Sequence, residues 1–405
     1  MSDQQEAPPS VRGLGEMFRG LGRRLAAGEA GILLVFLMVG AIWTFFQVAN
    51  NRFLSPGNLT NLMLQQAAVA TISIGVVLIL LLGEIDLSVA AASGFCASVM
   101  AVLMVQRGWP ALASMLVALG LGAAIGLFNG LMVTRFRIPS FVVTLAVSLT
   151  LVGLQLYVLG STGTLNLPDN LVTRLTSTFF TPVVGWVIAV IVVACTLLFS
   201  LIGRNRRKSA GLNVGTVRGL VFRVVLIAAA IFSAVFIFNQ DRGLPLAVCI
   251  VTGLALIFAY VTERTRFGRH MFAVGGNSEA ARRAGIRIDN VRVLVFVMGS
   301  TLAAAGGVLA ASRLLAVNQS SGGSDLLLMA IAGPVIAGTS LFGGRGSVWS
   351  ALLGAIVIGS IANGMDLLAL ASSVKYIVTG LVLITAVTVE AITRLRRSAG
   401  GAPET

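Results

Sequence analysis

Charged side chains are scarce in this chain. Asp, Glu, Lys and Arg together make up 11% of its 405 residues, whereas 57% of the residues are hydrophobic. The mean hydropathy is +0.95. Because an ordinary soluble domain carries about 25% charged residues, this composition excludes a soluble globular protein. It predicts a polytopic membrane protein.

Cysteine and histidine are also scarce. Cys96, Cys195 and Cys249 all fall inside apolar runs, and no pair of them has the spacing of a metal site. We therefore expect packing residues, without disulfides or reactive thiols. The single histidine, His270, has no second titratable group placed to work with it. These absences disfavour a metal centre and a membrane-embedded enzyme.

The chain has two lysines, Lys208 and Lys375. A phosphate-binding P-loop needs Gly-Lys-Ser/Thr after a strand, and the glycine-rich segment 338–347 contains no lysine. We expect this segment to be a close turn between two helices. The chain should have no ATPase motif of its own and no cofactor.

Long apolar runs are what the chain does have. A membrane-spanning helix needs about 20 mostly apolar residues, because lipid cannot satisfy exposed backbone groups. The fold class is therefore an all-α integral membrane bundle of about twelve helices, within a range of ten to twelve. The predicted spans are 30–49, 64–83, 88–106, 111–134, 139–160, 182–203, 223–239, 245–262, 293–315, 327–341, 347–364 and 371–391. The short 327–341 segment either spans or re-enters the membrane.

Arginine sets the expected orientation. With the N-terminus inside, the outer loops hold only Arg52, Arg107, Arg174, Arg242 and Arg313, and the other span-flanking arginines are cytoplasmic. An even number of spans places both termini in the cytoplasm, as an N-terminal tail over 1–29 and a C-terminal tail over 394–405. The net charge of +14 then reflects contact with membrane lipid and not with nucleic acid.

The segment 83–88 places Glu84, Asp86 and Ser88 between two apolar runs. An acid inside a membrane is costly and is a functional hypothesis by default. Asp86 could instead cap the helix that starts near Ser88, in a turn at the membrane face. Both interpretations stay open. Thr144 and Asn363 are further polar groups in or beside spans, where packing is the default role and a sugar pathway is the alternative.

The loop 264–292 is polar and basic, which is unusual between spans. It contains Arg269, Gly276, the run Glu279-Ala280-Ala281 and Gly285. Ser278 could cap a short helix that Gly285 ends, and the small alanine face would let another protein approach closely. The alternative is an amphipathic helix on the inner leaflet, held there by its arginines.

Five segments, in this order and spacing, resemble the permease subunits of sugar-importing ABC transporters of the ribose, galactose, arabinose and xylose group. The segments are 58–62, 84–89, 138–145, 267–286 and 338–341. Within that group the chain looks most like the xylose permeases, because 204–245 looks like an inserted span pair that ribose-type permeases lack.

The resemblance implies a function and partners. Residues 30–393 would form a transmembrane permease domain in the bacterial inner membrane, as a homodimer. A periplasmic sugar-binding protein would deliver a monosaccharide, with D-xylose as the favoured pentose, and a separate ABC ATPase subunit would bind ATP. Glu279, Ala280, Ala281, Gly285, Arg269 and Gly276 would form the coupling loop to that ATPase. Glu84, Asp86, Ser88, Thr144 and Asn363 would lie near the translocation pathway.

Two other classes of transport protein remain open. An ion-coupled secondary sugar transporter would also be polytopic and basic inside, but it would carry broken helices in matched halves and a buried titratable relay. Glu84 and Asp86 have no matching acidic break in the second half of the chain. A channel would need a ring of charged or carbonyl ligands, and no selectivity-filter segment is apparent.

Overall fold

A computed structural model describes residues 31–211 and 217–399, so the predicted tail over 1–29 lies outside the described residues, as does the end of the other tail. The described chain is almost entirely helical. Its helices are α2 (Gly31–Ala49), α3 (Pro56–Leu81), α4 (Val89–Val105), α5 (Ala111–Arg135), α6 (Ser140–Leu159), η1 (Gly160–Thr162), α7 (Leu171–Ser177), α8 (Pro182–Ser209), α9 (Val217–Asn239), α10 (Leu246–Arg264), α11 (Arg266–Gly276), α12 (Ser278–Arg283), α13 (Ile288–Leu314), α14 (Ser324–Ile336), α15 (Trp349–Leu367) and α16 (Ser372–Ala399). Its strands are β1 (Thr164–Asn166), β2 (Phe179–Phe180), β3 (Leu244–Pro245) and β4 (Ala316–Asn318).

Each of the twelve predicted spans corresponds to a helix, although the bounds differ. Within residues 31–211 and 217–399, eight helices are long and apolar enough to cross a membrane. The shorter apolar helices are α4, α14 and the part of α2 from Val35 to Ala49. α3 begins at Pro56, eight residues before the predicted start at residue 64. Pro56 is well suited to a first helical position, and Ser55 precedes it as the cap. α16 continues through Ala399, so the first residues of the predicted 394–405 tail are helical.

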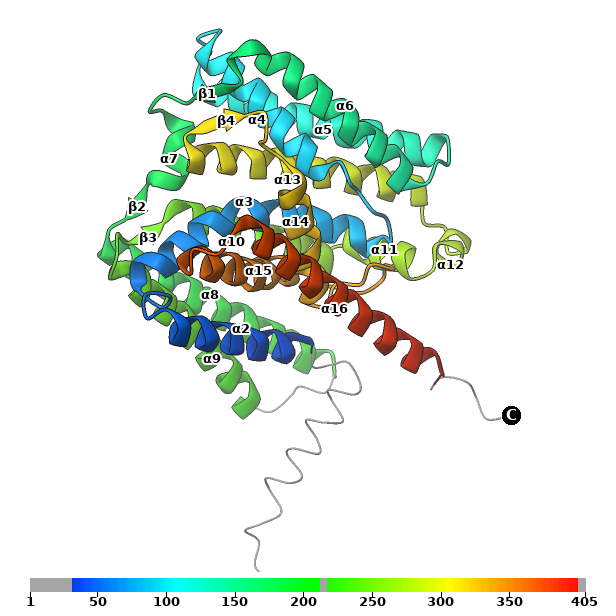
Figure 1. Cartoon of the computed structure of the whole chain (residues 1–405). Coiled ribbons are helices and arrows are strands. Elements are labelled where there is room, and N and C mark those ends of the chain that lie inside the picture. The colour runs from blue at the N-terminus through cyan, green and yellow to red at the C-terminus, as the bar shows by residue number, and fades with distance from the viewer. Residues whose placement is uncertain (1–30, 212–216, 400–405) are drawn as a thin grey trace, which may run out of the picture.

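The helices are arranged with their short connecting elements gathered at two opposite ends (Figure 1). The strands and α7 lie at one end, called here the strand end, and α11 and α12 lie at the other, called the α11–α12 end. α3 is the most buried of the candidate spans and packs against α13, whereas α8 and α9 form a mostly exposed pair. The core therefore surrounds α3 and α13.

α5 and α13 pack with almost no side chain between their backbones. Gly122, Gly126 and Gly130 recur every four residues along α5 and face α13. A Cβ placed on Gly126 would lie 2.3 Å from the carbonyl oxygen of Phe296. Small residues at this spacing let membrane helices approach closely, which replaces the hydrophobic driving force that lipid does not supply.

Two small antiparallel sheets close the strand end. β1 pairs with β4, and β2 pairs with β3. Arg242 lies 4.5 Å above the ring of Phe179, forms an ion pair with Asp241 at 3.0 Å and donates to Asn61 Oδ1 at 3.0 Å. The residues of the predicted 204–245 insertion are thus tied to the start of α3. These two- and three-residue strands were not predicted, because they are too short to show a period.

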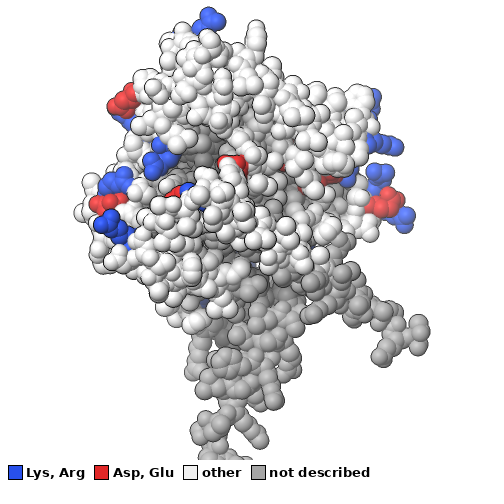
Figure 2. Space-filling view, viewed as in Figure 1, with Lys and Arg blue, Asp and Glu red and all other residues white. Residues whose placement is uncertain are grey.

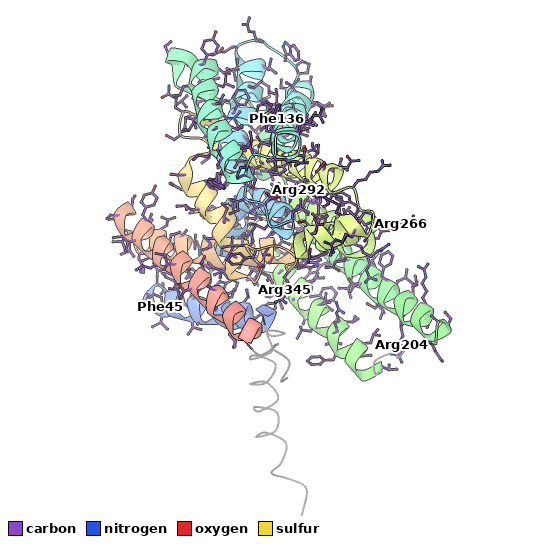
Figure 3. The ribbon with its side chains drawn as sticks, turned by 90° about the vertical axis from the view of Figure 1, so that its right-hand side faces the viewer. Phe45, Phe136, Arg204, Arg266, Arg292 and Arg345 are labelled. Carbon is purple, nitrogen blue, oxygen red and sulfur yellow. The ribbon has the colours of Figure 1, made fainter. Side chains whose placement is uncertain are left out.

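Charged side chains on the surface lie mainly towards the two ends of the molecule. In the visible face, Lys and Arg gather towards the ends and a broad middle zone is mostly uncharged (Figure 2). A view onto the α11–α12 end shows Arg204, Arg266, Arg292 and Arg345, from four different segments, on that side (Figure 3). Many large apolar side chains are exposed between the ends. An apolar belt of this kind is typical of a membrane protein.

Candidate functional site

α11 and α12 form a protruding elbow at the α11–α12 end. α11 begins after its cap, Thr265, whose Oγ1 accepts a hydrogen bond from Gly268 N at 3.2 Å. α12 begins after Asn277, whose Oδ1 accepts from Ala280 N at 2.9 Å, so the cap is Asn277 where Ser278 was predicted. Gly285 has φ +81° and follows the end of α12. The predicted short helix is therefore present, with its cap one residue earlier.

The faces of α12 differ. Ala281 is buried in the main hydrophobic core, whereas Glu279, Ala280 and Gly285 are exposed. Arg269 and Gly276 on α11 are exposed as well. The exposed face of α12 therefore presents one small side chain, Ala280, among charged side chains, a surface that another protein could contact.

Glycines fasten this elbow to the rest of the fold. Three segments that are far apart in sequence meet at Gly83, Gly275, Gly343 and Gly344, called here the glycine junction. Gly344 N donates to the carbonyl oxygen of Leu81 at 3.0 Å. A Cβ on Gly275 would lie 1.8 Å from that same oxygen, so no side chain fits there. At these glycines the end of α11 thus contacts the end of α3 and the loop between α14 and α15 through backbone atoms.

The predicted close turn over 338–347 is correct, and its glycines have a further use. Gly343 has φ +83°, a conformation that favours glycine. A Cβ on it would lie 2.7 Å from Gly83 N and 2.8 Å from Gly275 O. This packing joins the elbow, the 82–88 turn and the 338–347 loop at close range, and an interface without side chains leaves little room for repacking.

Glu84 has a charged neighbour that the local sequence does not reveal. Arg292 Nε, from α13, lies 3.0 Å from Glu84 Oε1, and both side chains are mostly buried. The sequence predicts a cytoplasmic position for Arg292 but not this pairing. The ion pair connects the turn between α3 and α4 to the first turns of α13.

Asp86 is buried and hydrogen-bonded within its own turn. Its Oδ1 accepts from Ser88 N at 2.7 Å and from Ser88 Oγ at 2.6 Å. Asn129 of α5 donates through Nδ2 to Ser88 Oγ at 3.0 Å. Asp86 therefore satisfies the backbone N–H of the residue that precedes α4. It is not the predicted cap, because Ser88 occupies the N-cap position and no side chain caps α4.

Hydroxyl groups from α6 hold the same turn. Ser140 Oγ accepts from Ile85 N at 3.2 Å, and Thr144 Oγ1 accepts from Leu87 N at 3.0 Å. Thr144 is fully buried and also donates to Ser140 O at 2.9 Å. The motif over 138–145 therefore supplies partners for turn backbone that would otherwise be buried without any.

Four of the five predicted pathway residues come together, and one does not. Glu84, Asp86, Ser88 and Thr144 form one cluster after the end of α3. Asn363 instead exchanges two amide hydrogen bonds with Asn58, at 2.8 and 3.1 Å, near the start of α3. α3 has 26 residues, and a helix rises about 1.5 Å per residue, so α3 is about 39 Å long. The Asn58–Asn363 pair and the cluster of four residues are separated by most of this length.

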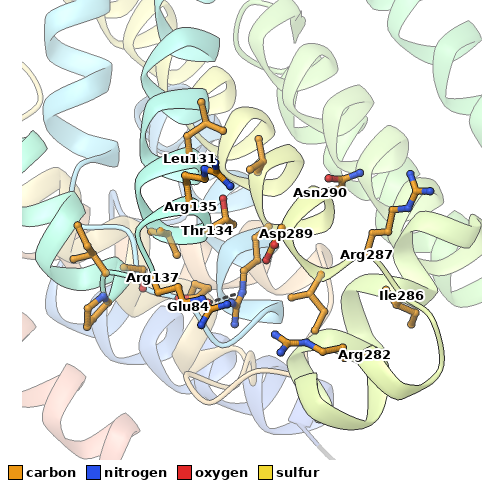
Figure 4. Close-up of a pocket in the computed structure, with 17 residues that line it drawn as sticks. Glu84, Leu131, Thr134, Arg135, Arg137, Arg282, Ile286, Arg287, Asp289 and Asn290 are labelled. Atoms are coloured by element: carbon orange, nitrogen blue, oxygen red, sulfur yellow. Dashed lines mark ion pairs between the residues drawn. The ribbon is translucent and has the colours of Figure 1, made fainter.

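A pocket of about 900 Å³ opens beside the elbow (Figure 4). It is lined by the end of α5, the start of α6, α12 and the start of α13. Basic side chains outnumber acidic ones around it, since Arg135, Arg137, Arg282, Arg287 and Arg292 face two acids, Glu84 and Asp289. The pocket suits an acidic partner surface more than a neutral ligand.

Comparison with known proteins shows which family the chain resembles. Residues 58–387 match the family described as the branched-chain amino acid transport system / permease component. The chain is 34% identical to the xylose transport system permease protein XylH of Escherichia coli K12 over 368 residues, covering 90% of this chain and 93% of that protein. It is 31% identical to XylH of Haemophilus influenzae over 91% of this chain and 98% of the relative.

More distant relatives carry other sugars in their names. The ribose import permease protein RbsC of Escherichia coli K12 is 28% identical over 84% of this chain and 87% of its own length. No solved structure matches the chain. The matched family extends from the start of α3 into α16 and includes the elbow, the 82–88 turn and the glycine junction, so the chain belongs to this family of transport-system permeases.

Proposed function

We propose that this protein is the membrane permease subunit of an ATP-driven sugar importer and that it carries a monosaccharide, with a pentose such as D-xylose favoured. The observation that carries the proposal is the likeness to xylose permeases over 90% of the chain. The exposed elbow adds physical support, because a permease without its own ATPase needs a surface on which an ATPase can act.

The partners follow from this role. A separate ABC ATPase subunit binds the α11–α12 end and supplies ATP hydrolysis, and a periplasmic sugar-binding protein delivers the sugar to the strand end. Two copies of the chain form the transporter, since one elbow per chain matches two ATPase domains. The arginines at the α11–α12 end support a cytoplasmic position for that end in a bacterial inner membrane. With an even number of spans, ten or twelve, both termini lie in the cytoplasm.

We assign the coupling contact to Glu279, Ala280, Ala281, Gly285, Arg269 and Gly276. Exposed residues of this set meet the ATPase, and buried Ala281 seats α12 against the core. Closure of the ATPases then pushes the elbow, and the glycine junction passes that motion to the ends of α3 and α14. The coupling is mechanical and biases two arrangements of the helices.

For the pathway, Glu84, Asp86, Ser88 and Thr144 frame its cytoplasmic end, and Asn363 lies near its outer end. Their hydrogen bonds and ion pair are internal to the chain, so we assign them the shape of the pathway and not direct contact with sugar. Within 204–245 there is one span, α9, and the exposed pair that it forms with α8 lies at the edge of the bundle, away from this cluster.

Affinity purification in mild detergent tests the function directly. The ATPase subunit should co-purify with the tagged chain, and D-xylose together with its binding protein should stimulate ATP hydrolysis and uptake into proteoliposomes. Uptake by the chain alone, driven by a proton or sodium gradient without ATP, would assign it to the ion-coupled secondary transporters and overturn the proposal.

A further inference from the structure

A polar patch lies on the part of the surface where lipid would otherwise be expected. Asp325, near the start of α14, accepts a hydrogen bond through Oδ2 from the hydroxyl of Tyr376 on α16 at 2.7 Å. Asp325 is exposed, and the side chain of Tyr376 is 54% exposed. Beside them Lys375 forms an ion pair with Asp366. We call Asp325 and Tyr376, with neighbouring Ser324, the α14–α16 patch.

The patch lies between the two ends of the bundle. Ser73, in the second half of α3, donates through Oγ to the carbonyl oxygen of Ala330 at 3.1 Å. Asp325 precedes Ala330 by five residues, a rise of about 7.5 Å along α14. A carboxylate exposed at this depth is costly in lipid and marks a functional surface by default.

The loop before α14 is built to reach this depth. Gly94, the sixth residue of α4, is so close to Ser321 that an added Cβ would lie 2.1 Å from its carbonyl oxygen. Gln155 Nε2 donates to the carbonyl oxygens of Asn318 and Ser321 at 3.0 and 2.9 Å. The chain therefore turns back from β4 into the bundle, and α14 starts there. Non-helical backbone at membrane depth is tolerated where it is buried in protein or lines water.

The proposed homodimer restricts what can cover the patch. In a two-fold pair each copy would present the same patch to its partner. Two copies of Asp325 in direct, dry contact would repel strongly at low dielectric. A water-filled gap between the copies removes both this repulsion and the cost of exposing a carboxylate to lipid.

The chemistry of the patch suits a neutral polyol. A carboxylate accepts hydrogen bonds from sugar hydroxyls, while the tyrosine offers a donor and acceptor at the edge of an apolar ring. An ion pathway would instead need a ring of like charges, and the second acid here, Asp366, is paired with Lys375. We propose that Asp325 and Tyr376 contact the transported sugar midway across the membrane; this rests on the proposed sugar-importer function.

Accessibility of a single cysteine tests the position of the patch. The three native cysteines are replaced by alanine, and Ser324→Cys is compared with Leu149→Cys, which lies midway along α6 on its exposed apolar face. The complete transporter, with ATPase and binding protein, is treated in proteoliposomes with a charged, membrane-impermeant methanethiosulfonate. Ser324→Cys should react, and saturating D-xylose during turnover should slow the reaction at least threefold. Leu149→Cys should not react.

Either of two results would overturn the inference. Ser324→Cys as unreactive as Leu149→Cys would mean that lipid or dry protein covers the patch. Reaction without any slowing by D-xylose would mean that the patch meets water but not the sugar. Absence of ATP-dependent uptake with the cysteine-free parent would instead count against the proposed function, so the two failures are distinguishable.

Sugar selectivity is a second measurement, and it would not change if Asp325 and Tyr376 had only a structural role. Tyr376→Phe and Asp325→Asn each remove one hydrogen-bonding function with little change in shape. We expect each to change the ratio of uptake rates for D-xylose and a singly deoxygenated xylose by roughly three- to tenfold, the effect of one hydrogen bond. An unchanged ratio in both variants, with normal protein levels, would exclude contact with the sugar.

Discussion

Arg292 Nε lies 3.0 Å from Glu84 Oε1 and joins the start of α13 to the turn that follows α3. The pair sits beside the glycine junction, where α11 and the 338–347 loop also meet that turn. The ion pair thus joins α13 to the turn after α3. The glycine junction, which packs through backbone atoms, joins the elbow to the same turn. This arrangement gives the proposed coupling a definite mechanical route that substitutions can interrupt.

Breaking the ion pair should destabilise the fold. Arg292→Met leaves Glu84 charged and mostly buried without its partner, and we expect a loss of roughly 1–3 kcal/mol in the free energy of unfolding. A thermal-shift measurement in detergent reads this as a fall in melting temperature. Arg283→Met, which removes the exposed pair with Glu279, serves as the control and should leave the melting temperature unchanged. Equal melting temperatures for both variants would contradict a stabilising pair.

Gly275→Ala should separate the elbow from α3. The added methyl group would lie 1.8 Å from the carbonyl oxygen of Leu81, so the end of α11 must shift away. We expect sugar-stimulated ATP hydrolysis and uptake to fall several-fold. Gly253→Ala in α10 meets no atom within 4 Å and should retain both activities. Wild-type uptake with Gly275→Ala would show that the glycine junction transmits nothing.

The proposed coupling surface can be tested at Ala280, because its side chain is exposed. Ala280→Trp should weaken co-purification of the ATPase at least tenfold and abolish sugar-stimulated uptake, while membrane insertion and melting temperature stay normal. Ala281 is unsuitable for this purpose, since it is buried and a larger side chain would disrupt packing. Leu149→Trp, on an exposed face of α6, controls for a bulky surface residue. Normal ATPase binding by Ala280→Trp would remove α12 from the interface.

Gly285→Pro should uncouple hydrolysis from uptake. Gly285 has φ +81°, whereas proline fixes φ near −65°, and its N–H donates to Arg282 O at 3.0 Å. The turn between α12 and α13 must therefore change direction, which moves the elbow relative to α13. ATPase activity that no longer responds to sugar, in a correctly inserted permease, is the expected result. Normal sugar-stimulated uptake would contradict it.

Two substitutions at Asp86 distinguish a structural role from a charged one. Asp86→Asn keeps an oxygen that can accept from Ser88 N, so we expect nearly normal stability and uptake. Asp86→Ala leaves that buried N–H without its partner and should cost about 0.5–2 kcal/mol, seen as a lower melting temperature. If Asp86→Asn abolished uptake at an unchanged melting temperature, the charge itself would be required.

Much of the helical organisation follows from local sequence. Apolar runs predicted where twelve helices lie, since a run long enough to cross lipid is recognisable without knowledge of its neighbours. Their bounds were less accurate. α3 starts at Pro56 and α16 continues to Ala399, because caps and packing decide helix ends, and hydropathy does not report them.

The candidate site was predicted only in part. The elbow was recognisable as a polar, basic break between apolar runs. The capping role predicted for Asp86 was wrong, because Ser88 occupies the N-cap position of α4 and Asp86 bonds to Ser88 itself. Asn58 is the partner of Asn363, and Arg292 is the partner of Glu84, yet nothing near either residue in sequence marks it as such. Asp325 and Tyr376 were not predicted as a site, because each is unremarkable within its own segment.

The sequence by itself determined the class of protein, the approximate spans, the basic end and the family resemblance. These properties are sums over neighbouring residues or ordered motifs, so no contact between distant segments is needed to read them. The tertiary structure alone decided the Glu84–Arg292 pair, the glycine junction and the α14–α16 patch. Each depends on segments far apart in the chain that packing brings within a few ångströms, and a linear pattern does not encode which distant backbone or side chain will arrive there.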